Sequence, residues 1–479
     1  MIRKAFVILT SCLTIPLFSQ KQAFTSFLAD SAMDHAQVSF CLIDADSGNT
    51  VFEYNSRTSL IPASVMKLIT ASSAIELLGP DHIFKTSIGY TGKISKFLKI
   101  LDGDIVIRGG GDPSLGSENF AEHYAGFTDR WIDAVRSLKI KKIKGGVITD
   151  DSYFDYLPVP AKWLWEDAGN YYGAGAYGLS IFDNTYKIHL SIAPDSSSLL
   201  IKGITPSECR FEFSNWLVAA GTEDKGYVFA APYSTNGWLA GSLPSNLKDF
   251  VLKASITDPP FIMSKLIDQK LRDSGIRVSA FPATTRLMQG PVVKSVTIID
   301  SVSSPPLSKI IEVLNHESIN LYAEHLVKEL GKVYNDNGST EKGVRRIYEF
   351  LSMAGIGTEG LFIEDGSGLS PLNAVSSEGI AALLLFMKTH GKHFSEFYAS
   401  LPDAGKEGTL KNHFTDPVFE SRMKAKSGSM TRVRSYAGYL RTLSGNELIF
   451  CIIVNNFSGA SQPVISHIEE ILKETIQTN

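Results

Sequence analysis

The order of three short polar motifs limits what this chain can fold into more than any other feature. A Ser-x-x-Lys spans residues 64–67, a Ser-x-Asn spans residues 318–320 and a Lys-Ser-Gly spans residues 426–428. In a helix, residues three positions apart lie on one face, so Lys67 would lie beside Ser64. A serine hydroxyl becomes an effective nucleophile when a neighbouring base removes its proton. The motifs therefore place a nucleophile, a base and two supporting polar clusters on one polypeptide.

The surroundings of Ser64 distinguish it from other serines in the same pattern. Residues 62–80 begin with a proline, continue as an apolar helical stripe and end at Gly-Pro, which predicts a helix with Ser64 in its first turn. Exposed N–H groups there favour a developing negative charge. The alternative is a capping serine and a solvated lysine on an ordinary core helix. Ser-x-x-Lys also occurs at residues 245–248, 339–342 and 421–424, so a single match has little weight.

Ser318 stands between two predicted helices, at residues 307–314 and 320–330. A short loop between helices can hold the Ser318 hydroxyl and the Asn320 amide toward a cleft. Ser-x-Asn also begins at Ser47, Ser117 and Ser444, in turn-like stretches where these residue types are common for backbone reasons.

The Lys-Ser-Gly motif precedes two predicted strands, at residues 435–440 and 447–454, that flank a turn. A lysine beside serine hydroxyls on an open strand is a receptor for a carboxylate. Gly428 has no side chain, so a ligand backbone can lie against this strand, and the Ser429 N–H can point at an oxyanion. The alternative is a surface turn that contains Lys426 by chance.

Taken in this order, the three motifs resemble the active site of the penicillin-binding proteins and serine β-lactamases. The chain is most similar to the D-alanyl-D-alanine carboxypeptidase/endopeptidase family, the class C low-molecular-mass penicillin-binding proteins (peptidase family S13). About 250 residues separate the first two motifs, an interval that most of the superfamily lacks. Ile319 replaces the usual Asp and Ser427 the usual Thr, and neither change removes a reacting group. Further similar segments are residues 62–64, 109–113, 304–307, 315–320, 365–370 and 437–439.

The resemblance implies an α/β (α+β) fold of the penicillin-binding-protein/β-lactamase-like transpeptidase type, split by a large, mainly β insertion of two nested domains. The sequence pattern agrees with such an insertion, because short strand-like segments replace helical patterns between about residues 88 and 291. We also expect a hairpin of residues 38–43 and 50–54, and helices at residues 342–354, 378–387 and 464–476. The predicted divisions are a signal peptide at 1–19, the catalytic domain at 20–88 and 292–479, insertion domain II at 89–185 and 262–291, and nested domain III at 186–261.

The implied reaction is acyl transfer from a D-Ala-D-Ala peptide bond or a D-centred cross-link of peptidoglycan, inhibited by β-lactam antibiotics and without a metal or organic cofactor. Lys67 would act as base if burial or the nearby cation of Lys426 lowers its pKa. Ser318 would relay a proton to the leaving amine, and Asn320 would hold Lys67. The implied catalytic residues are Ser64, Lys67, Ser318, Asn320 and Lys426, and the substrate-binding residues are Ser427, Gly428, Ser429 and Asp167.

Asp167 is included because of the unusual stretch around it. Two tryptophans, Trp163 and Trp165, lie beside Glu166 and Asp167, and residues 170–173 add two tyrosines. We expect Asp167, with Glu166 as a substitute, to pair with the free ammonium group of the stem peptide's diamino acid. The alternative is a tryptophan-anchored loop that packs the insertion on the catalytic domain.

Composition and charge exclude some classes of protein. The chain has 479 residues, and a chain of this length is too long for one domain. Because 44% of the residues are hydrophobic, it can bury large cores. Its net charge of −4 is spread without long blocks of like charge, so the sequence shows no basic segment that would bind nucleic acid. No His or Cys cluster has metal-ligand spacing, since His316 and His325 lie nine positions apart. The oligomeric state is not predicted.

The N-terminus has the pattern of a secretory signal. Basic residues 3–4 precede an apolar stretch at residues 5–18 that is too short to span a bilayer, which predicts cleavage near Ser19 and a periplasmic or secreted protein without an integral membrane span. Lipoprotein processing at Cys12 is the alternative, although the apolar stretch continues past that residue. The cysteines that remain, Cys41, Cys209 and Cys451, are expected to be buried thiols or to form at most one bridge.

Two other functions compete with a D,D-peptidase. A class A β-lactamase has a Glu-x-x-Leu-Asn downstream of its Ser-x-Asn, whereas here the Glu-Val-Leu-Asn of residues 312–315 has the wrong spacing and lies upstream. The second competing function is that of a non-hydrolytic peptidoglycan-binding protein. The presence of all five implied catalytic residues argues against it, because binding alone would not require them.

Overall fold

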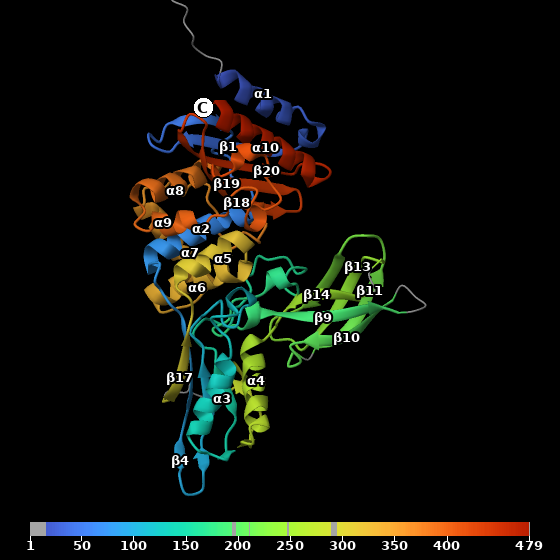
Figure 1. The fold of residues 1–479 in the computed structure, drawn as a ribbon, viewed down its shortest axis with the longest axis vertical. Helices are drawn as coiled ribbons and strands as arrows, with labels where there is room; N and C mark the ends of the chain where they lie inside the picture. Colours follow the sequence, from blue (N-terminus) through green and yellow to red (C-terminus); the bar gives the residue numbers. More distant parts are fainter. Residues whose placement is uncertain (1–15, 194–197, 210, 247–248, 289–294, 479) are drawn as a thin grey trace, which may run out of the picture.

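The computed structural model describes residues 16–478, except 194–197, 210, 247–248 and 289–294. Figure 1 shows a lobe at the top of the view that contains both the first and the last helix, and an insertion that extends below it and to one side. Most of the predicted signal segment, with Cys12, lies outside the described residues. The first described helix, α1 (Pro16–Leu28), packs along the last, α10 (Ser461–Thr478).

The upper lobe is built on a five-stranded antiparallel sheet in the order β18-β19-β20-β1-β2. Strands from before and after the insertion pair at its centre, where Phe40 of β1 lies opposite Ile452 of β20. The bounds of these strands are β1 Gln37–Asp44, β2 Thr50–Tyr54, β18 Met423–Met430, β19 Val433–Arg441 and β20 Glu447–Asn455.

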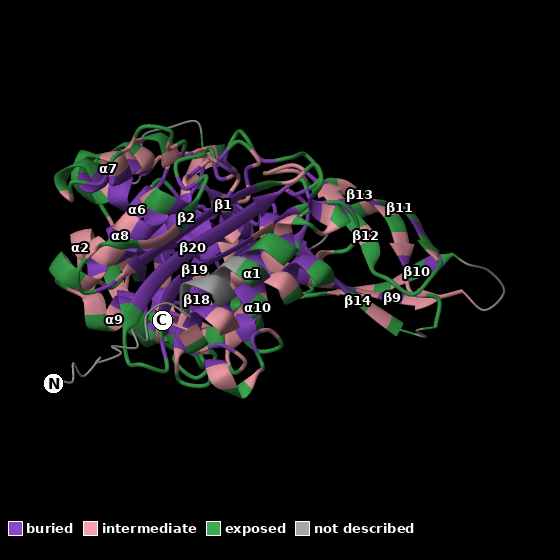
Figure 2. Ribbon diagram, turned by 90° about the horizontal axis from the view of Figure 1, so that it is seen from above, coloured by how far each residue is buried: buried purple, intermediate pink, exposed green. Residues whose placement is uncertain are grey.

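Strand β20 is buried on both faces, which explains its continuous apolar sequence. Ile449, Cys451 and Ile453 belong to the core under the helices of one side, whereas Phe450 and Ile452 belong to the core under α1 and α10. Because successive side chains of a strand point to opposite faces, one hydrophobic run fills two layers. In Figure 2 the central strands are accordingly drawn almost entirely as buried.

The helices of the second layer agree with the predicted segments. They are α2 Met66–Leu78, α5 Leu307–Glu317, α6 Asn320–Asn335, α7 Thr340–Met353 and α8 Ser377–His390. The hairpin β1–β2, the strands β19 and β20, and helix α10 are likewise confirmed. One short helix, α9 (Phe394–Ala399), was not predicted.

The first part of the insertion contains two helices that the mainly β prediction did not include, α3 (Phe127–Ser137) and α4 (Pro259–Asp273). Helix α4 begins with the pair Pro259 and Pro260, in a region where only short strand-like segments were predicted. In the structure this pair forms the first helical turn, where a missing N–H does no harm, and the Asp258 carboxylate accepts a hydrogen bond from the Phe261 N–H at 3.2 Å.

These helices pack with two sheets, in the orders β16-β8-β6-β3-β17 and β15-β7-β5-β4. Strands β3 and β17, where the chain leaves and re-enters the upper lobe, pair with each other. The bounds are β3 Lys85–Tyr90, β4 Lys93–Ser95, β5 Ile100–Asp102, β6 Ile105–Arg108, β7 Lys142–Ile143, β8 Val147–Asp150, β15 Arg277–Val278, β16 Ala283–Thr284 and β17 Thr297–Ser303.

A smaller all-β part projects from the side of the molecule (Figure 1). It contains two three-stranded sheets, in the orders β10-β9-β14 and β11-β13-β12. The bounds are β9 Thr185–Ile192, β10 Leu199–Thr205, β11 Glu212–Ala219, β12 Lys225–Ala230, β13 Asn236–Leu243 and β14 Asp249–Ser255.

Cys41, Cys209 and Cys451 are free and buried. Of the two expectations, buried thiols or one disulfide bridge, the first is confirmed. Across the described part of the chain, no helix combines the length and the apolar character needed to cross a membrane. Within the same residues, no group of three or more His, Cys, Asp and Glu side chains is placed to hold a metal ion.

Candidate active site

Ser64 lies in a tight turn that leads into α2. Residues Ala63–Val65 form a short 3-10 helix, and Ala63 has a φ of 47°, a conformation that L-residues other than glycine seldom adopt. The turn is enclosed by glycines, because a Cβ on Gly368 would lie 1.9 Å from the Ala63 carbonyl oxygen, and one on Gly428 would lie 2.6 Å from that of Pro62. Close packing of backbone on backbone therefore holds Ser64 in place.

Lys67 is fully buried directly beside Ser64. Its Nζ lies 2.9 Å from Ser64 Oγ and donates hydrogen bonds to Asn320 Oδ1 at 2.6 Å and to the Ser367 carbonyl at 2.7 Å. Burial lowers the pKa of Lys67 to about 7, although the negative charges of Asp365 and Glu324 oppose the shift. A substantial fraction of Lys67 is therefore a neutral amine near pH 7.

Ser318 and Asn320 approach the cleft from the junction of α5 and α6. Ser318 ends α5 in the left-handed conformation, with φ 57°, and Asn320 is the first residue of α6. The bend aims both side chains at the same space. Asn320 accepts the hydrogen bond from Lys67 and donates one through Nδ2 to the carbonyl of Tyr172, in the insertion, at 2.8 Å.

Lys426 on β18 is also fully buried. Its Nζ donates to Ser318 Oγ at 2.9 Å and to the Ser427 carbonyl at 2.8 Å. Burial lowers the pKa of Lys426 well below its usual value, and the charge of Lys67 lowers it further. The five implied catalytic residues therefore form two hydrogen-bonded groups. One joins Ser64, Lys67 and Asn320, and the other joins Lys426 and Ser318.

The cleft in front of these residues contains groups that were not predicted. Ser427 Oγ donates to Thr409 Oγ1 at 2.7 Å, and Arg434 donates to the Ser429 hydroxyl. Arg434 faces Ser429 across the β18–β19 hairpin, so pairing the segment of the Lys-Ser-Gly motif with the residues just before the predicted strand at 435–440 would have found it. The residues that line the cleft are Ser64, Ser318, Thr409, His413, Ser427, Gly428, Ser429, Arg434, Tyr436 and Ile465.

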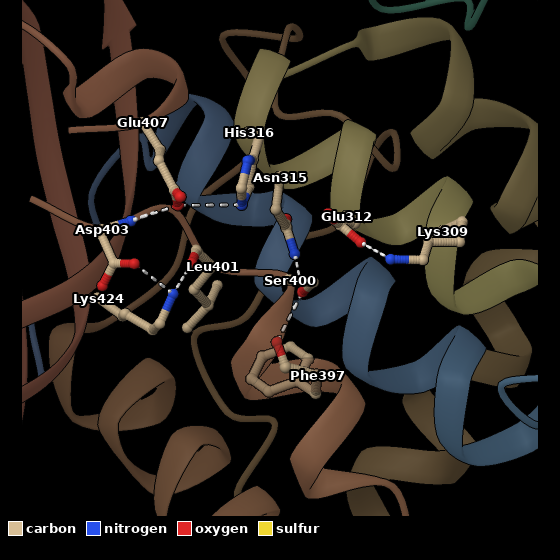
Figure 3. A network of polar contacts seen from close by, with 10 residues as sticks. All are labelled: Lys309, Glu312, Asn315, His316, Phe397, Ser400, Leu401, Asp403, Glu407 and Lys424. Carbon is tan, nitrogen blue, oxygen red and sulfur yellow. Dashed lines mark hydrogen bonds and ion pairs between the residues drawn. The ribbon is translucent and has the colours of Figure 1, made fainter. Parts of the chain in front are cut away.

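A polar network ties the end of α5 to the start of β18 (Figure 3). His316 Nε2 lies 3.9 Å from Glu407, whose carboxylate accepts a hydrogen bond from the Asp403 N–H at 3.3 Å. Asp403 in turn accepts one from Lys424 on β18 at 3.1 Å. The network therefore braces the segment that carries Thr409 between the Ser318 bend and the Lys426 strand.

Residues 312–315, the segment compared with a β-lactamase motif, lie beside this network. Glu312 pairs with Lys309 at 2.7 Å, and Asn315 donates to Ser400 Oγ at 2.9 Å (Figure 3). Neither Glu312 nor Asn315 is among the residues that line the cleft.

Two buried carboxylates behind Lys67 also escaped the sequence reasoning. Glu324, one helical turn after Asn320, accepts hydrogen bonds from the N–H groups of Ser367 at 2.9 Å and Gly366 at 3.2 Å. Asp365 accepts from the N–H of Gly368 at 2.7 Å. Together they hold the Ser367 carbonyl against Lys67. Burial raises the pKa of Glu324 to about 8, and a polar residue inside the apolar pattern of α6 was the signal that could have found it.

Asp167 lies in the loop that follows Trp163, outside the residues that line the cleft. Its side chain is buried, and burial, with the charge of Glu166, raises the pKa of Asp167 to about 6. Trp163 is buried and donates through Nε1 to Asp365 Oδ2 at 2.7 Å. This anchoring agrees with the alternative that the loop packs the insertion on the catalytic lobe, and the pairing of Asp167 with an ammonium group stays a prediction.

Comparison with known proteins identifies the family. The model of the D-Ala-D-Ala carboxypeptidase 3 (S13) family matches residues 20–475. The chain belongs to this family. It is accordingly an enzyme of the serine D-Ala-D-Ala carboxypeptidase class.

Individual relatives cover nearly all of the chain. A D-alanyl-D-alanine carboxypeptidase from Actinomadura sp. (strain R39) is 28% identical over 92% of this chain and 81% of its own length. The crystal structure of penicillin binding protein 4 (dacB) from Haemophilus influenzae superimposes with a TM-score of 0.80 at 21% identity, covering 95% of this chain and 99% of that one. A predatory peptidoglycan endopeptidase from Bdellovibrio bacteriovorus gives a TM-score of 0.51 at 16% identity, with 92% and 93% coverage. The fold is therefore that of the penicillin-binding proteins, as expected.

Proposed function

We propose that this enzyme hydrolyses D-alanyl-D-alanine ends, or D-centred cross-links, of peptidoglycan stem peptides through an acyl-enzyme on Ser64, and that β-lactams acylate the same residue. The observation that carries the proposal is the environment of Lys67. A neutral amine has two N–H donors, and those of Lys67 are directed at Asn320 Oδ1 and the Ser367 carbonyl. Its lone pair is then left for the proton of Ser64 Oγ, 2.9 Å away.

In the acylation step, Ser64 attacks the peptide carbonyl while its proton passes to Lys67. The backbone N–H groups of Ser64 and Ser429 receive the negative charge that develops on the carbonyl oxygen. Support comes from the closeness of β18 to the nucleophile, since a Cβ on Gly428 would lie 3.0 Å from the Ser64 nitrogen. The C–N bond then breaks as Ser318, held by Lys426, gives its proton to the leaving amine and takes up the proton that Lys67 had accepted. Water hydrolyses the Ser64 ester, which releases the peptide acid and restores the Ser64 hydroxyl.

The terminal carboxylate of the substrate is received at β18. Lys426 lies beneath the strand and donates a hydrogen bond to the Ser427 carbonyl, and the hydroxyls of Ser427 and Ser429 face the cleft. Arg434, beside Ser429, adds a cation at the surface of the cleft. Such a cluster favours substrates that end in a free carboxylate.

Replacing Lys426 with alanine is expected to lower kcat/KM on D-Ala-D-Ala peptides at least tenfold. A charge-assisted contact to a carboxylate contributes about 1.5 to 3 kcal/mol, which corresponds to roughly a ten- to hundredfold change in rate. Steady-state kinetics on a peptide and on its C-terminally amidated form measure this effect. The loss should be smaller on the amidated form, and equal losses would mean that Lys426 acts on Lys67 or on the transition state instead.

Replacing Asp167 with asparagine is expected to raise KM for peptides with a free side-chain ammonium and to leave penicillin acylation unchanged, because penicillin has no such group. Since burial raises the pKa of Asp167 to about 6, the KM advantage should be present above pH 6 and fade below it, as the carboxylate becomes protonated. Glu166→Gln tests the exposed neighbour as the expected substitute, and a larger rise in KM for this variant would move the role from Asp167 to Glu166. A parallel fall in penicillin acylation and peptide hydrolysis would show that Asp167 is structural.

The direct test of the function is the intact mass of the purified protein, first with a labelled penicillin and then with purified muropeptides. A stable penicilloyl adduct with release of D-alanine supports a carboxypeptidase, and conversion of cross-linked dimers to monomers supports an endopeptidase. Rapid turnover of penicillin without a lasting adduct would favour a β-lactamase. Binding of muropeptides with neither adduct nor product would favour a non-hydrolytic receptor.

The proposed substrate also requires that the enzyme work outside the cytoplasm, in the periplasm or as a secreted protein. The pattern of residues 1–19 supports this location. N-terminal sequencing of the mature protein from cell fractions tests it, with cleavage near Ser19 as the expected result.

A further inference from the structure

The sheet β11-β13-β12 exposes a row of aromatic side chains on its outer face. Along its strands, Leu217, Val228 and Leu239 point into the core and are buried. Because side chains alternate along a strand, their neighbours point outward. Among these, Trp216 is 64% exposed and Tyr227 is 38% exposed. The exposed and half-buried residues of these strands are drawn in green and pink in Figure 2.

Strand register places two of these rings in one row across the sheet. Trp216 and Tyr227 lie on the two outer strands, each opposite Ala240 on the central one. Strands are about 4.8 Å apart, so the two rings stand about 10 Å from each other, the length of a disaccharide, with a small residue between them. In the next row, Trp238 and Phe229 stack with ring centroids 5.4 Å apart. An exposed aromatic patch of this kind on a folded domain marks a binding surface.

A single loop connects the aromatic face to the catalytic cleft. Trp165, which is 52% exposed, lies with its ring 6.0 Å from that of Trp238. The same loop is anchored by Trp163 on Asp365 and carries the Tyr172 carbonyl that accepts the hydrogen bond from Asn320. A groove between loop and sheet is lined by residues of both, among them Tyr172 and Tyr227. The surface therefore runs from the outer sheet toward the nucleophile.

We propose that this aromatic face binds the glycan chain of peptidoglycan while the attached peptide reaches Ser64. The inference rests on the proposed function, which gives the substrate a saccharide on the far side of its peptide. The C–H groups on the face of a pyranose ring pack against an aromatic face, and its hydroxyls bond to polar groups at the edge. Ser214 and Ser242, on the same outer face, are placed at that edge.

The charges around this face favour a neutral sugar over an anionic surface. Lys225, at the end of the Tyr227 strand, is paired with Glu223 at 2.8 Å. Glu212 begins the Trp216 strand on the same face. With both signs present and the lysine paired, the described residues of these strands do not form the concentrated positive charge that binds anionic lipid or nucleic acid.

Binding is tested apart from catalysis in a Ser64→Ala background, with peptide-free glycan strands and with β-1,4-linked N-acetylglucosamine oligomers as probes. Trp216→Ala should weaken binding at least about tenfold, as the loss of a stacking ring does in other aromatic sites. Trp216→Phe should restore most of it, and Phe281→Ala, at an exposed aromatic residue of the insertion outside this sheet, should leave it unchanged. Equal affinity of the Trp216→Ala and parent proteins for both probes would overturn the proposal.

Kinetics separate a failure of this inference from a failure of the proposed function. In the active enzyme, Trp216→Ala should raise KM for a glycan-linked peptide, without a change in the rate of penicillin acylation. If penicillin does not acylate the parent enzyme, the proposed function fails, and the glycan-binding result stands by itself. If Trp216→Ala instead abolishes a dimer in light scattering, or binding to neutral lipid vesicles, the face has another occupant and the glycan assignment is wrong.

Discussion

Replacing Ser64 with alanine is expected to abolish covalent labelling by penicillin and hydrolysis of D-Ala-D-Ala peptides, and to leave the fold intact. The substitution removes the only atom that can form the ester, and Ser64 is partly exposed to the cleft, so little packing is lost. Intact mass and fluorescent penicillin labelling measure the first effect, and the melting temperature measures the second.

Ser339→Ala is the matched control, because Ser339 opens another Ser-x-x-Lys. Its hydroxyl accepts a hydrogen bond from the Lys342 N–H at 3.3 Å and caps α7. This variant should lose some stability yet label fully. Residual labelling of the Ser64 variant, or an adduct mapped to Ser245, Ser339 or Ser421, would contradict the assignment of the nucleophile.

Replacing Lys67 with methionine is expected to slow acylation about 10²- to 10⁴-fold, the range for loss of a positioned general base. Methionine has a similar length and no basic group, so the buried site stays filled. In the parent enzyme, acylation should rise with pH through about 7, because Lys67 accepts the serine proton only after losing its own. The variant should lack this rise. Stopped-flow acylation between pH 5 and 9 measures both effects.

Lys328→Met controls for the removal of a buried lysine. Lys328 is also fully buried, on α6, and is bonded to the Leu157 carbonyl at 2.9 Å and to Asp155, away from the cleft-lining residues. Its loss should lower the melting temperature, while the folded fraction keeps the rise in acylation near pH 7. A pH profile of the Lys67 variant that matches the parent enzyme would show that another group is the base.

Much of the fold could be predicted because its signals are local. The apolar run of β20 and the helical periodicity of α5 to α8 depend on neighbouring residues, so pattern reasoning located them. Helix α4 was missed because a Pro-Pro pair has the same local appearance at a helix start as in a loop. What decided between the two was the packing of α4 against β8 and β16.

The candidate site divides in the same way. The three motifs in their order predict Ser64, Lys67, Ser318, Asn320 and Lys426 as catalytic residues, and the structure brings their side chains together in two hydrogen-bonded groups. The protonation states and the alignment of these side chains cannot be predicted from the motifs. The pKa of Lys67 falls to about 7 because segments from several parts of the chain bury it, and the Ser367 carbonyl reaches it because Glu324 and Asp365 hold that loop. The burial of Lys67 and its alignment with the Ser367 carbonyl depend on many contacts between residues that are distant in sequence. Only the tertiary structure therefore determines them.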